Sequence, residues 1–143
     1  MLSEGRRLAV VVATGEIDTL AEMARVCGDA ARLGRAVRVF FRDESIPAIC
    51  RVEVAARLIP ATAISAEHEG EPDATDAPTA GAAIEAALQE LAGAGDVRLY
   101  ACSSSLYIWG VESRDLIPAI SGARGLIAFL AEDLAGASEV LTY

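Results

Sequence analysis

The stretch LAVVVATGEIDTLAEMARVCGDAARLGRAVRVFF, residues 8–41, decides the fold class. Residues 8–13 form a continuous apolar and β-branched run, typical of a strand that is covered on both faces of a sheet. Apolar residues then recur at helical spacing from Ile17 to Ala31, and Gly34 ends this helix. Residues 35–41, RAVRVFF, have the pattern of a second strand. This strand–helix–strand order predicts two parallel strands.

The rest of the chain continues the alternation of helices and strands. Residues 66–78 are acidic, contain two prolines and lack large apolar side chains, so we predict a mobile surface loop there. The segment before it has mixed periodicity, and we predict a loop followed by a short helix around residues 49–58. Further helices are expected over residues 79–92 and 124–135, the latter with Ile127, Leu130 and Leu134 on one face that Leu126 and Phe129 widen. Strands are expected over residues 97–101 and 138–143, with a helical turn near 106–110 and a short helix from Arg114, capped by Ser113 and ended by Gly122.

The length of 143 residues fits one domain with a substantial apolar core. Together with the order of elements, it predicts the α/β class. We expect a single-domain, three-layer fold over residues 1–143, with a mainly parallel sheet of about five strands and helices on both faces.

The composition excludes several classes of function. A net charge of −9 argues against a nucleic-acid partner, because binding phosphates requires a concentrated basic face. All 12 basic residues are arginines, which rules out a lysine Schiff base and a P-loop lysine. No apolar run reaches the roughly 18 residues of a membrane span, so we expect a cytoplasmic protein without a membrane partner. The three cysteines are then expected to be reduced, and their odd number fits a disulfide framework poorly.

Cys102 is the main candidate for chemistry. It follows the apolar run 97–101, and ligands of open parallel sheets bind outside the carboxyl ends of the strands. Ser103 to Ser105 come next and suit a helix N-terminus, where unpaired backbone N–H groups stabilise a thiolate. Cys102 and Ser105 form a Cys-x-x-Ser motif, in which a hydroxyl replaces the resolving thiol of Cys-x-x-Cys. This arrangement suits a group carrier better than an oxidoreductase.

The other cysteines and Cys102 itself have structural interpretations as well. Free cysteines are among the most buried residues, so Cys102 is also consistent with inert packing, its serines being ordinary capping residues. Cys27 lies in the apolar stripe of the first helix and is interpreted as structural. Cys50 is either structural or a second redox thiol at the same sheet edge as Cys102.

Three further features are weaker candidates for binding. The single histidine, His68, lies in the acidic loop, so we predict neither a metal site nor a cofactor. The pair Thr14-Gly15 could approach an anion at the start of the next helix, although a single glycine is not a nucleotide-binding fingerprint. Tyr107 and Trp109 are interpreted as packing or interface residues rather than a ligand cage.

Residues 97–143, VRLYACSSSLYIWGVESRDLIPAISGARGLIAFLAEDLAGASEVLTY, resemble the C-terminal half of the DsrE/DsrF-like family, which includes sulfur-relay proteins of the TusD type. The N-terminal strand–helix–strand is also similar, whereas residues 42–78 lie outside the resemblance. The shared features are the strand end Ala101-Cys102, the small polar run Ser103 to Ser105, Gly110, Asp115-Leu116, Gly122, and the final strand at residues 140–143.

The resemblance implies a five-stranded α/β fold that assembles as a homotrimer or hexamer. In the sulfur-relay members, the cysteine matching Cys102 accepts sulfur as a persulfide and passes it to the next carrier. The first hypothesis is therefore a cytoplasmic sulfur carrier, or sulfurtransferase-like protein, with a sulfur donor or acceptor protein as partner. Ser104 or Ser105 and the backbone N–H groups after Cys102 would stabilise the anionic sulfur.

Two alternatives stay open. The protein could be a non-enzymatic homo-oligomeric assembly or small-ligand-binding module with an unreactive Cys102. A redox sensor is the third possibility, and it requires Cys50 within disulfide reach of Cys102. Independently, the apolar segment around Tyr107 and the alanine-rich helices predict oligomerisation, because large apolar patches usually mark interfaces.

Overall fold

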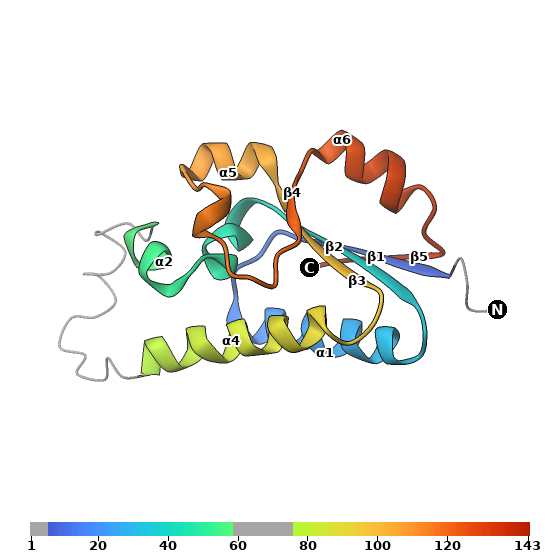
Figure 1. Ribbon diagram of the computed structural model, residues 1–143, viewed down its shortest axis with the longest axis horizontal. Coiled ribbons are helices and arrows are strands. Elements are labelled where there is room, and N and C mark those ends of the chain that lie inside the picture. Colours follow the sequence, from blue (N-terminus) through green and yellow to red (C-terminus); the bar gives the residue numbers. More distant parts are fainter. Residues whose placement is uncertain (1–5, 59–75) are drawn as a thin grey trace.

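A parallel sheet of five strands lies at the centre of the structure (Figure 1). The computed structural model describes residues 6–58 and 76–143, and the five strands are counted within those residues. The strands lie in the order β4-β3-β2-β1-β5, and every neighbouring pair is parallel, so all the carboxyl ends meet at one edge. The strands are β1 (Arg7–Val12), β2 (Ala36–Phe41), β3 (Val97–Cys102), β4 (Gly122–Arg124) and β5 (Glu139–Thr142).

One layer of helices covers each face of the sheet (Figure 1). The helices α1 (Ile17–Arg32) and α4 (Asp76–Ala92) lie on one face. The opposite face carries α5 (Ser103–Trp109) and α6 (Leu126–Phe129), which continues into the π-helical turn η3 (Leu130–Leu134). The α/β class and the three layers predicted from the sequence are confirmed.

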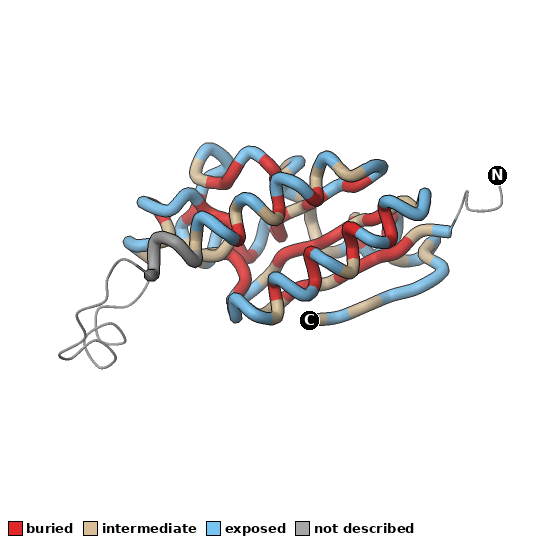
Figure 2. Tube along the Cα trace, turned by 90° about the horizontal axis from the view of Figure 1, so that it is seen from below, coloured by how far each residue is buried: buried red, intermediate tan, exposed pale blue. Residues whose placement is uncertain are grey.

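Strand β1 shows why a continuous apolar run forms an inner strand. Leu8, Val10 and Val12 are buried in the larger of two apolar clusters, together with residues of α1 and α4. Ala9 faces the other way and is buried in a smaller cluster with Phe129 of α6. Both faces of the strand therefore bury apolar side chains, and Figure 2 shows the matching alternation of buried and exposed residues along the helices.

The segment between β2 and β3 differs from the predicted loop and helix. A 3-10 helix, η1 (Asp43–Ile49), follows β2, and a separate helix, α2 (Val52–Leu58), comes after a break. The break falls at Cys50, which has extended dihedral angles and forms a β-bridge with Leu116. This long-range bridge fixes the boundary between the two helices, and local sequence does not show it.

Helix α4 begins at Asp76, three residues before the predicted start at Thr79. The last three residues of the predicted acidic loop are therefore helical. Pro78 is compatible with this position, because the first-turn backbone N–H groups that a proline lacks have no partner within a helix. The remainder of that loop lies outside the described residues.

The prediction for residues 124–135 is wrong in its start and in the centre of its buried face, which passes through Phe129 and not through Ile127 and Leu130. Residues 122–124 form the edge strand β4, so Gly122 begins a strand instead of ending a helix. Phe129 is 0% exposed, whereas Ile127 is 76% exposed and Leu130 is exposed as well. Ile127 and Phe129 both lie in α6, ahead of the π-helical turn, and the buried face runs through Phe129 and Asp133, whose carboxylate is approached by arginines of the sheet.

Two shorter elements around Cys102 also differ in detail. The helical turn expected near residues 106–110 is part of a helix that begins at Ser103, directly after β3. The short helix expected from Arg114 is a 3-10 turn, η2 (Ser113–Asp115), which Glu112 caps in place of Ser113. None of the helices in the described residues is long and apolar enough to cross a membrane.

Candidate functional site

Cys102 is the last residue of β3 and the N-cap of α5. Its backbone is extended, and Gly110, with a φ of 70°, ends the helix that follows. Cys102 therefore lies where it was predicted, at the carboxyl edge of the sheet between an inner strand and the start of a helix. The thiol accepts no capping hydrogen bond from the amides of α5.

The side chain of Cys102 is buried, with 5% of the residue exposed. It belongs to the smaller apolar cluster, on the face of the sheet that α6 covers. The other buried members of this cluster are Ala9, Phe40 and Phe129, and the rings of Phe40 and Phe129 stack at 4.7 Å between centroids. In this conformation the thiol is shielded from large reagents and from another protein.

The three serines after Cys102 have different environments. Ser103 and Ser104 are exposed, whereas Ser105 is buried. The Ser105 Oγ accepts a hydrogen bond from the backbone N–H of Asp43 at 3.0 Å. Within the described residues, no hydrogen bond joins the Cys102 thiol to a serine hydroxyl. The Ser105 hydroxyl keeps its own hydrogen for a second bond, so its proposed contact with sulfur stays a prediction.

Asp43 holds α5 in place from the neighbouring strand end. It follows β2, and its φ of 53° is a left-handed conformation that is costly for a residue other than glycine. Ser105, near the start of α5, accepts from its N–H, and the Trp109 Nε1–H at the end of α5 donates to its carbonyl oxygen at 2.9 Å. The local sequence does not point to Asp43, because both of its partners lie more than 60 residues away.

The Thr14-Gly15 turn is occupied by protein. A side chain at Gly15 would place its Cβ 2.7 Å from the backbone carbonyl oxygen of Glu44. The space beside Gly15 is therefore filled by the backbone of Glu44 in η1. An anion at the same position would meet a carbonyl oxygen, which repels it.

Burial raises the pKa of the other two thiols. The pKa of Cys27 rises to about 12, because the thiol is desolvated on the buried face of α1. The pKa of Cys50 rises to about 11, mainly through burial and additionally through the negative charge of Asp115. Both remain protonated near neutral pH, and the Cys50 thiol donates to the carbonyl oxygen of Ile46. Because the reactive form is the thiolate, neither is suited to be a nucleophile.

These raised pKa values predict a loss of stability at alkaline pH. Above about pH 9 the unfolded state releases the thiol protons that the folded state keeps, so stability falls until the pH passes the folded values of about 12 and 11. Between about pH 8 and 10, wild type should lose about 1.4 kcal/mol more unfolding free energy than Cys27→Ala. Urea unfolding at both pH values measures this difference, and equal losses would contradict the buried, protonated thiol.

Cys50 and Cys102 belong to different apolar clusters. Cys50 packs in the larger cluster and Cys102 in the smaller one, and both thiols are free. The described residues contain no group of three or more histidine, cysteine or acidic side chains able to hold a metal ion. His68 lies outside the described residues.

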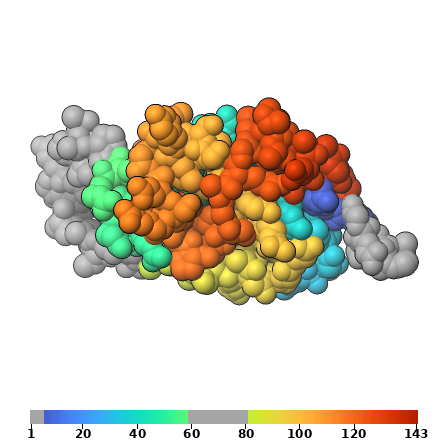
Figure 3. Space-filling model, turned by 45° about the horizontal axis from the view of Figure 1, so that its top comes forward, coloured from blue at the N-terminus to red at the C-terminus, as the bar shows by residue number. Residues whose placement is uncertain are grey.

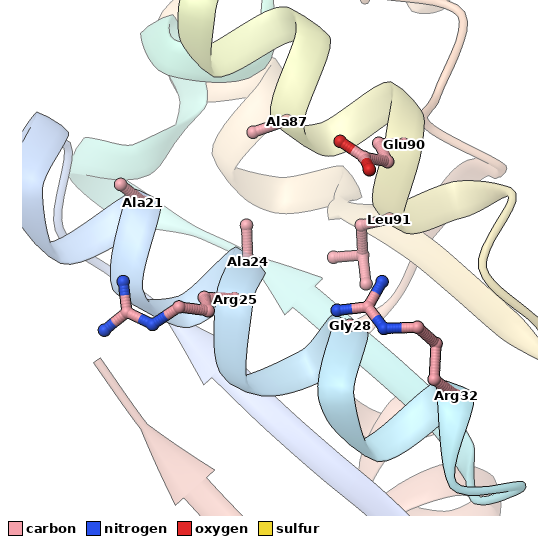
Figure 4. Close-up of a pocket in the computed structure, with 8 residues that line it drawn as sticks. All are labelled: Ala21, Ala24, Arg25, Gly28, Arg32, Ala87, Glu90 and Leu91. Atoms are coloured by element: carbon pink, nitrogen blue, oxygen red, sulfur yellow. The ribbon is translucent and has the colours of Figure 1, made fainter.

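A groove of about 250 Å³ lies between α1 and α4, across the sheet from Cys102 (Figure 4). Small residues form its floor, among them Ala24 and Gly28 of α1 and Ala87 of α4. Arg32 of α1 extends across Gly28 and pairs with Asp29 at 2.9 Å. The groove is thus the shallow contact of two alanine-rich helices, and it contributes nothing to the surroundings of the thiol.

A cluster of charged residues lies on the same face of the sheet as Cys102. Arg124 of β4 is the register partner of Cys102, and its guanidinium lies 4.9 Å from the centre of the Tyr100 ring. It pairs with the carboxylates of Glu132 and Asp133 on η3. This cluster was not predicted from the sequence, because Arg124 and Asp133 were expected to lie in one apolar helix. The signal in the sequence is an aspartate among apolar residues with an arginine nearby.

The fold and the site together define a class of protein: open, fully parallel α/β domains with a cysteine at the carboxyl end of an inner strand. Within this class, the model of the DsrE/DsrF-like family matches residues 8–135. The chain therefore belongs to the DsrE/DsrF-like family, as the sequence resemblance predicted.

Solved structures show the same fold at low sequence identity. A protein of unknown function from Methanobacterium thermoautotrophicum is similar with a TM-score of 0.64 and 13% identity, over 94% of this chain and 97% of the other. A conserved protein of unknown function from Bacteroides thetaiotaomicron is similar with a TM-score of 0.53 and 14% identity, over 100% of this chain and 99% of the other. No curated protein matches the chain.

Proposed function

We propose that the protein is a cytoplasmic sulfur carrier that holds a persulfide sulfur on Cys102. The observation that carries this proposal is the position of Cys102 at the junction of β3 and α5, in a chain of the DsrE/DsrF-like family. The raised pKa values of Cys27 and Cys50 argue against either of these two thiols as the carrier.

The proposed reaction is an exchange between thiols and persulfides. The Cys102 thiolate attacks the terminal sulfur of a donor protein's persulfide, a new S–S bond forms on Cys102, and the donor's S–S bond breaks to release its thiolate. An acceptor cysteine then attacks the terminal sulfur on Cys102 and restores the Cys102 thiolate. Each step exchanges one S–S bond for another, so it needs no external oxidant or reductant.

The serines have separate roles in this proposal. Ser104 is exposed in the first turn of α5, and in this proposal its hydroxyl donates a hydrogen bond to the anionic sulfur. Ser105 is fixed by Asp43 and has its hydroxyl hydrogen left to donate. Neither hydroxyl can displace the bound sulfur as a disulfide, so the persulfide would persist until an acceptor thiol arrives.

The direct test is mass spectrometry of the protein after incubation with a low-molecular-weight persulfide. Addition of one sulfur atom, mapped to the peptide that contains Cys102, is the expected result. Unmodified Cys102 under conditions that load a free thiol would remove the proposal.

The burial of Cys102 favours one alternative, a non-enzymatic assembly or small-ligand-binding module of the same fold. In that case the thiol is a packing residue beside Phe40 and Phe129. Native-state alkylation distinguishes the two: a thiol that is modified only when the whole protein unfolds supports the packing role.

We also propose that the chain assembles as a homotrimer or hexamer through α5. Tyr107 and Ile108 are 86% and 80% exposed on this helix, more apolar surface than a free helix face normally shows. Light scattering should give a multiple of the chain mass, and Ile108→Asp should reduce it. Leu33→Asp, at an exposed leucine beyond α1, is the matched control and should leave the mass unchanged. A monomeric wild type would contradict the assembly.

A further inference from the structure

One short segment covers the apolar cluster that contains Cys102. The cluster members on the sheet belong to β1, β2 and β3. Its remaining members, Leu126, Phe129, Leu134 and Ala137, all lie within residues 126–137. We call these twelve residues the cover; in Figures 1 and 3 its helical part lies over the sheet beside α5. Displacement of the cover would expose the cluster to solvent.

The cover has little regular structure of its own. Its α-helix, α6, has four residues, and the next five form the π-helical turn η3, a rare conformation that is frequent at functional sites. Glycines flank the helical part, Gly125 as the N-cap of α6 and Gly136 after η3. Phe129 is the deeply buried apolar anchor, and the nearby Ile127 faces solvent.

Arginines from three strands hold the turn η3. Arg7 of β1 donates from Nη1 to the carbonyl oxygens of Glu132 and Asp133 at 3.2 and 3.0 Å. Arg38 of β2 and Arg124 of β4 approach the Asp133 carboxylate at 3.8 and 3.1 Å. The cover is therefore attached to the sheet by one aromatic anchor and by one set of charged contacts.

Asp133 is the centre of these contacts. Its side chain is 9% exposed, whereas that of Glu132, the other acidic partner of Arg124, is 64% exposed. The Asp133 Oδ2 and the Arg124 Nε are buried and 3.1 Å apart, yet neither has a well-directed hydrogen bond among the described residues. The pair is thus held by charge more than by hydrogen bonding. Neutralising Asp133 would remove the buried carboxylate that Arg38 and Arg124 share, leaving Arg38 paired with Asp96 and Arg124 with the exposed Glu132, and loss of a buried partner of this kind is unfavourable.

We propose that residues 126–137 form a gate over Cys102 and that Asp133 is the latch of this gate. Opening of the gate breaks the contacts of Asp133 with Arg38 and Arg124, withdraws Phe129 from Phe40 and exposes the thiol. Asp133 is a positioning residue, since it acts on Cys102 through the cover. The inference rests on the proposed function, in which the thiol must meet another protein's cysteine, and it explains how a thiol that is 5% exposed does so.

The test is the rate of alkylation of each cysteine by iodoacetamide in the native protein, followed by peptide mass spectrometry. In Asp133→Asn, Cys102 should react about tenfold faster or more than in wild type, because a buried ion pair is lost. The factor should not change between about pH 7 and 9, as expected for easier access and not for a changed thiol. Cys27, which is buried in the other cluster, reports global unfolding and should keep its wild-type rate. Asp29→Asn removes the exposed ion pair with Arg32 and is the matched control, with no effect on Cys102.

Wild type provides a second measurement that does not depend on the variant folding. Local opening makes amide hydrogens exchange faster than global unfolding does, so those of residues 129–135 should exchange at least about tenfold faster than those of β1, β2 and β3. Equal protection of the cover and the strands would overturn the gate. An unchanged Cys102 rate in Asp133→Asn, or parallel acceleration of Cys27 and Cys102, would overturn it as well.

The gate and the carrier function can fail separately. Alkylation that depends on Asp133, without sulfur addition to Cys102, would support the gate and remove the carrier. Sulfur addition to Cys102 at a rate that Asp133→Asn does not change would support the carrier and remove the gate.

Discussion

Cys102→Ser should accept no sulfur from a low-molecular-weight persulfide under conditions in which wild type gains one sulfur atom per chain. The reason is chemical: an alcohol at this position is not deprotonated near neutral pH and does not attack a persulfide, while its size and shape keep the packing beside Phe129. Intact-mass measurement before and after treatment with a reductant, which removes a persulfide sulfur, gives the result directly.

Cys50→Ser is the matched control for this loss. The Cys50 thiol donates to the carbonyl oxygen of Ile46, and a hydroxyl can make the same bond, so the fold is preserved. Since the pKa of Cys50 is raised to about 11, this thiol should carry no sulfur near neutral pH, and the variant should load like wild type. If Cys50→Ser lost loading while Cys102→Ser loaded fully, the sulfur carrier would be Cys50 and not Cys102.

Phe129→Ala should lower the free energy of unfolding by about 3–5 kcal/mol. Phe129 is 0% exposed and its ring stacks on Phe40, so its removal loses buried apolar area and leaves a cavity between α6 and the sheet. The midpoint and slope of urea unfolding measure the change. Because this cavity lies in the cluster of Cys102, the variant should also react faster with alkylating reagents at Cys102.

Ile127→Ala is the control on the same helix. Ile127 is 76% exposed, and surface substitutions usually change stability by less than about 0.5 kcal/mol. Comparable losses in the two variants would mean that the cover is not anchored through Phe129.

The strand–helix–strand over residues 8–41 could be predicted because its two periods, continuous burial in the strands and helical spacing in α1, are properties of the local sequence. Strand β4 could not, since Gly122–Arg124 is a three-residue edge strand without an apolar run, formed by pairing with β3. The buried face of the helical segment after it was misassigned because the burial of Phe129 and Asp133 depends on Phe40 and on arginines of distant strands, which local spacing does not show.

The sequence predicted where Cys102 lies in the fold, but it did not predict which side chains surround it. The order of strand and helix placed Cys102 at a carboxyl edge, which depends only on local pattern and on parallel pairing. Its burial depends on the cover and on Phe40, and the fixing of Ser105 depends on Asp43, 62 residues away. Such contacts between distant segments are decided by packing, which a single sequence does not display.

Asp43 contacts two side chains of α5, which fixes the number of residues between them. The Asp43 backbone contacts both Ser105 and Trp109, which lie one turn apart on the same face of α5. Each residue of an α-helix turns by about 100°, so one inserted or deleted residue between Ser105 and Trp109 would rotate the indole away from its acceptor. We therefore expect insertions and deletions to be tolerated outside α5, for instance in the segment that joins it to β4.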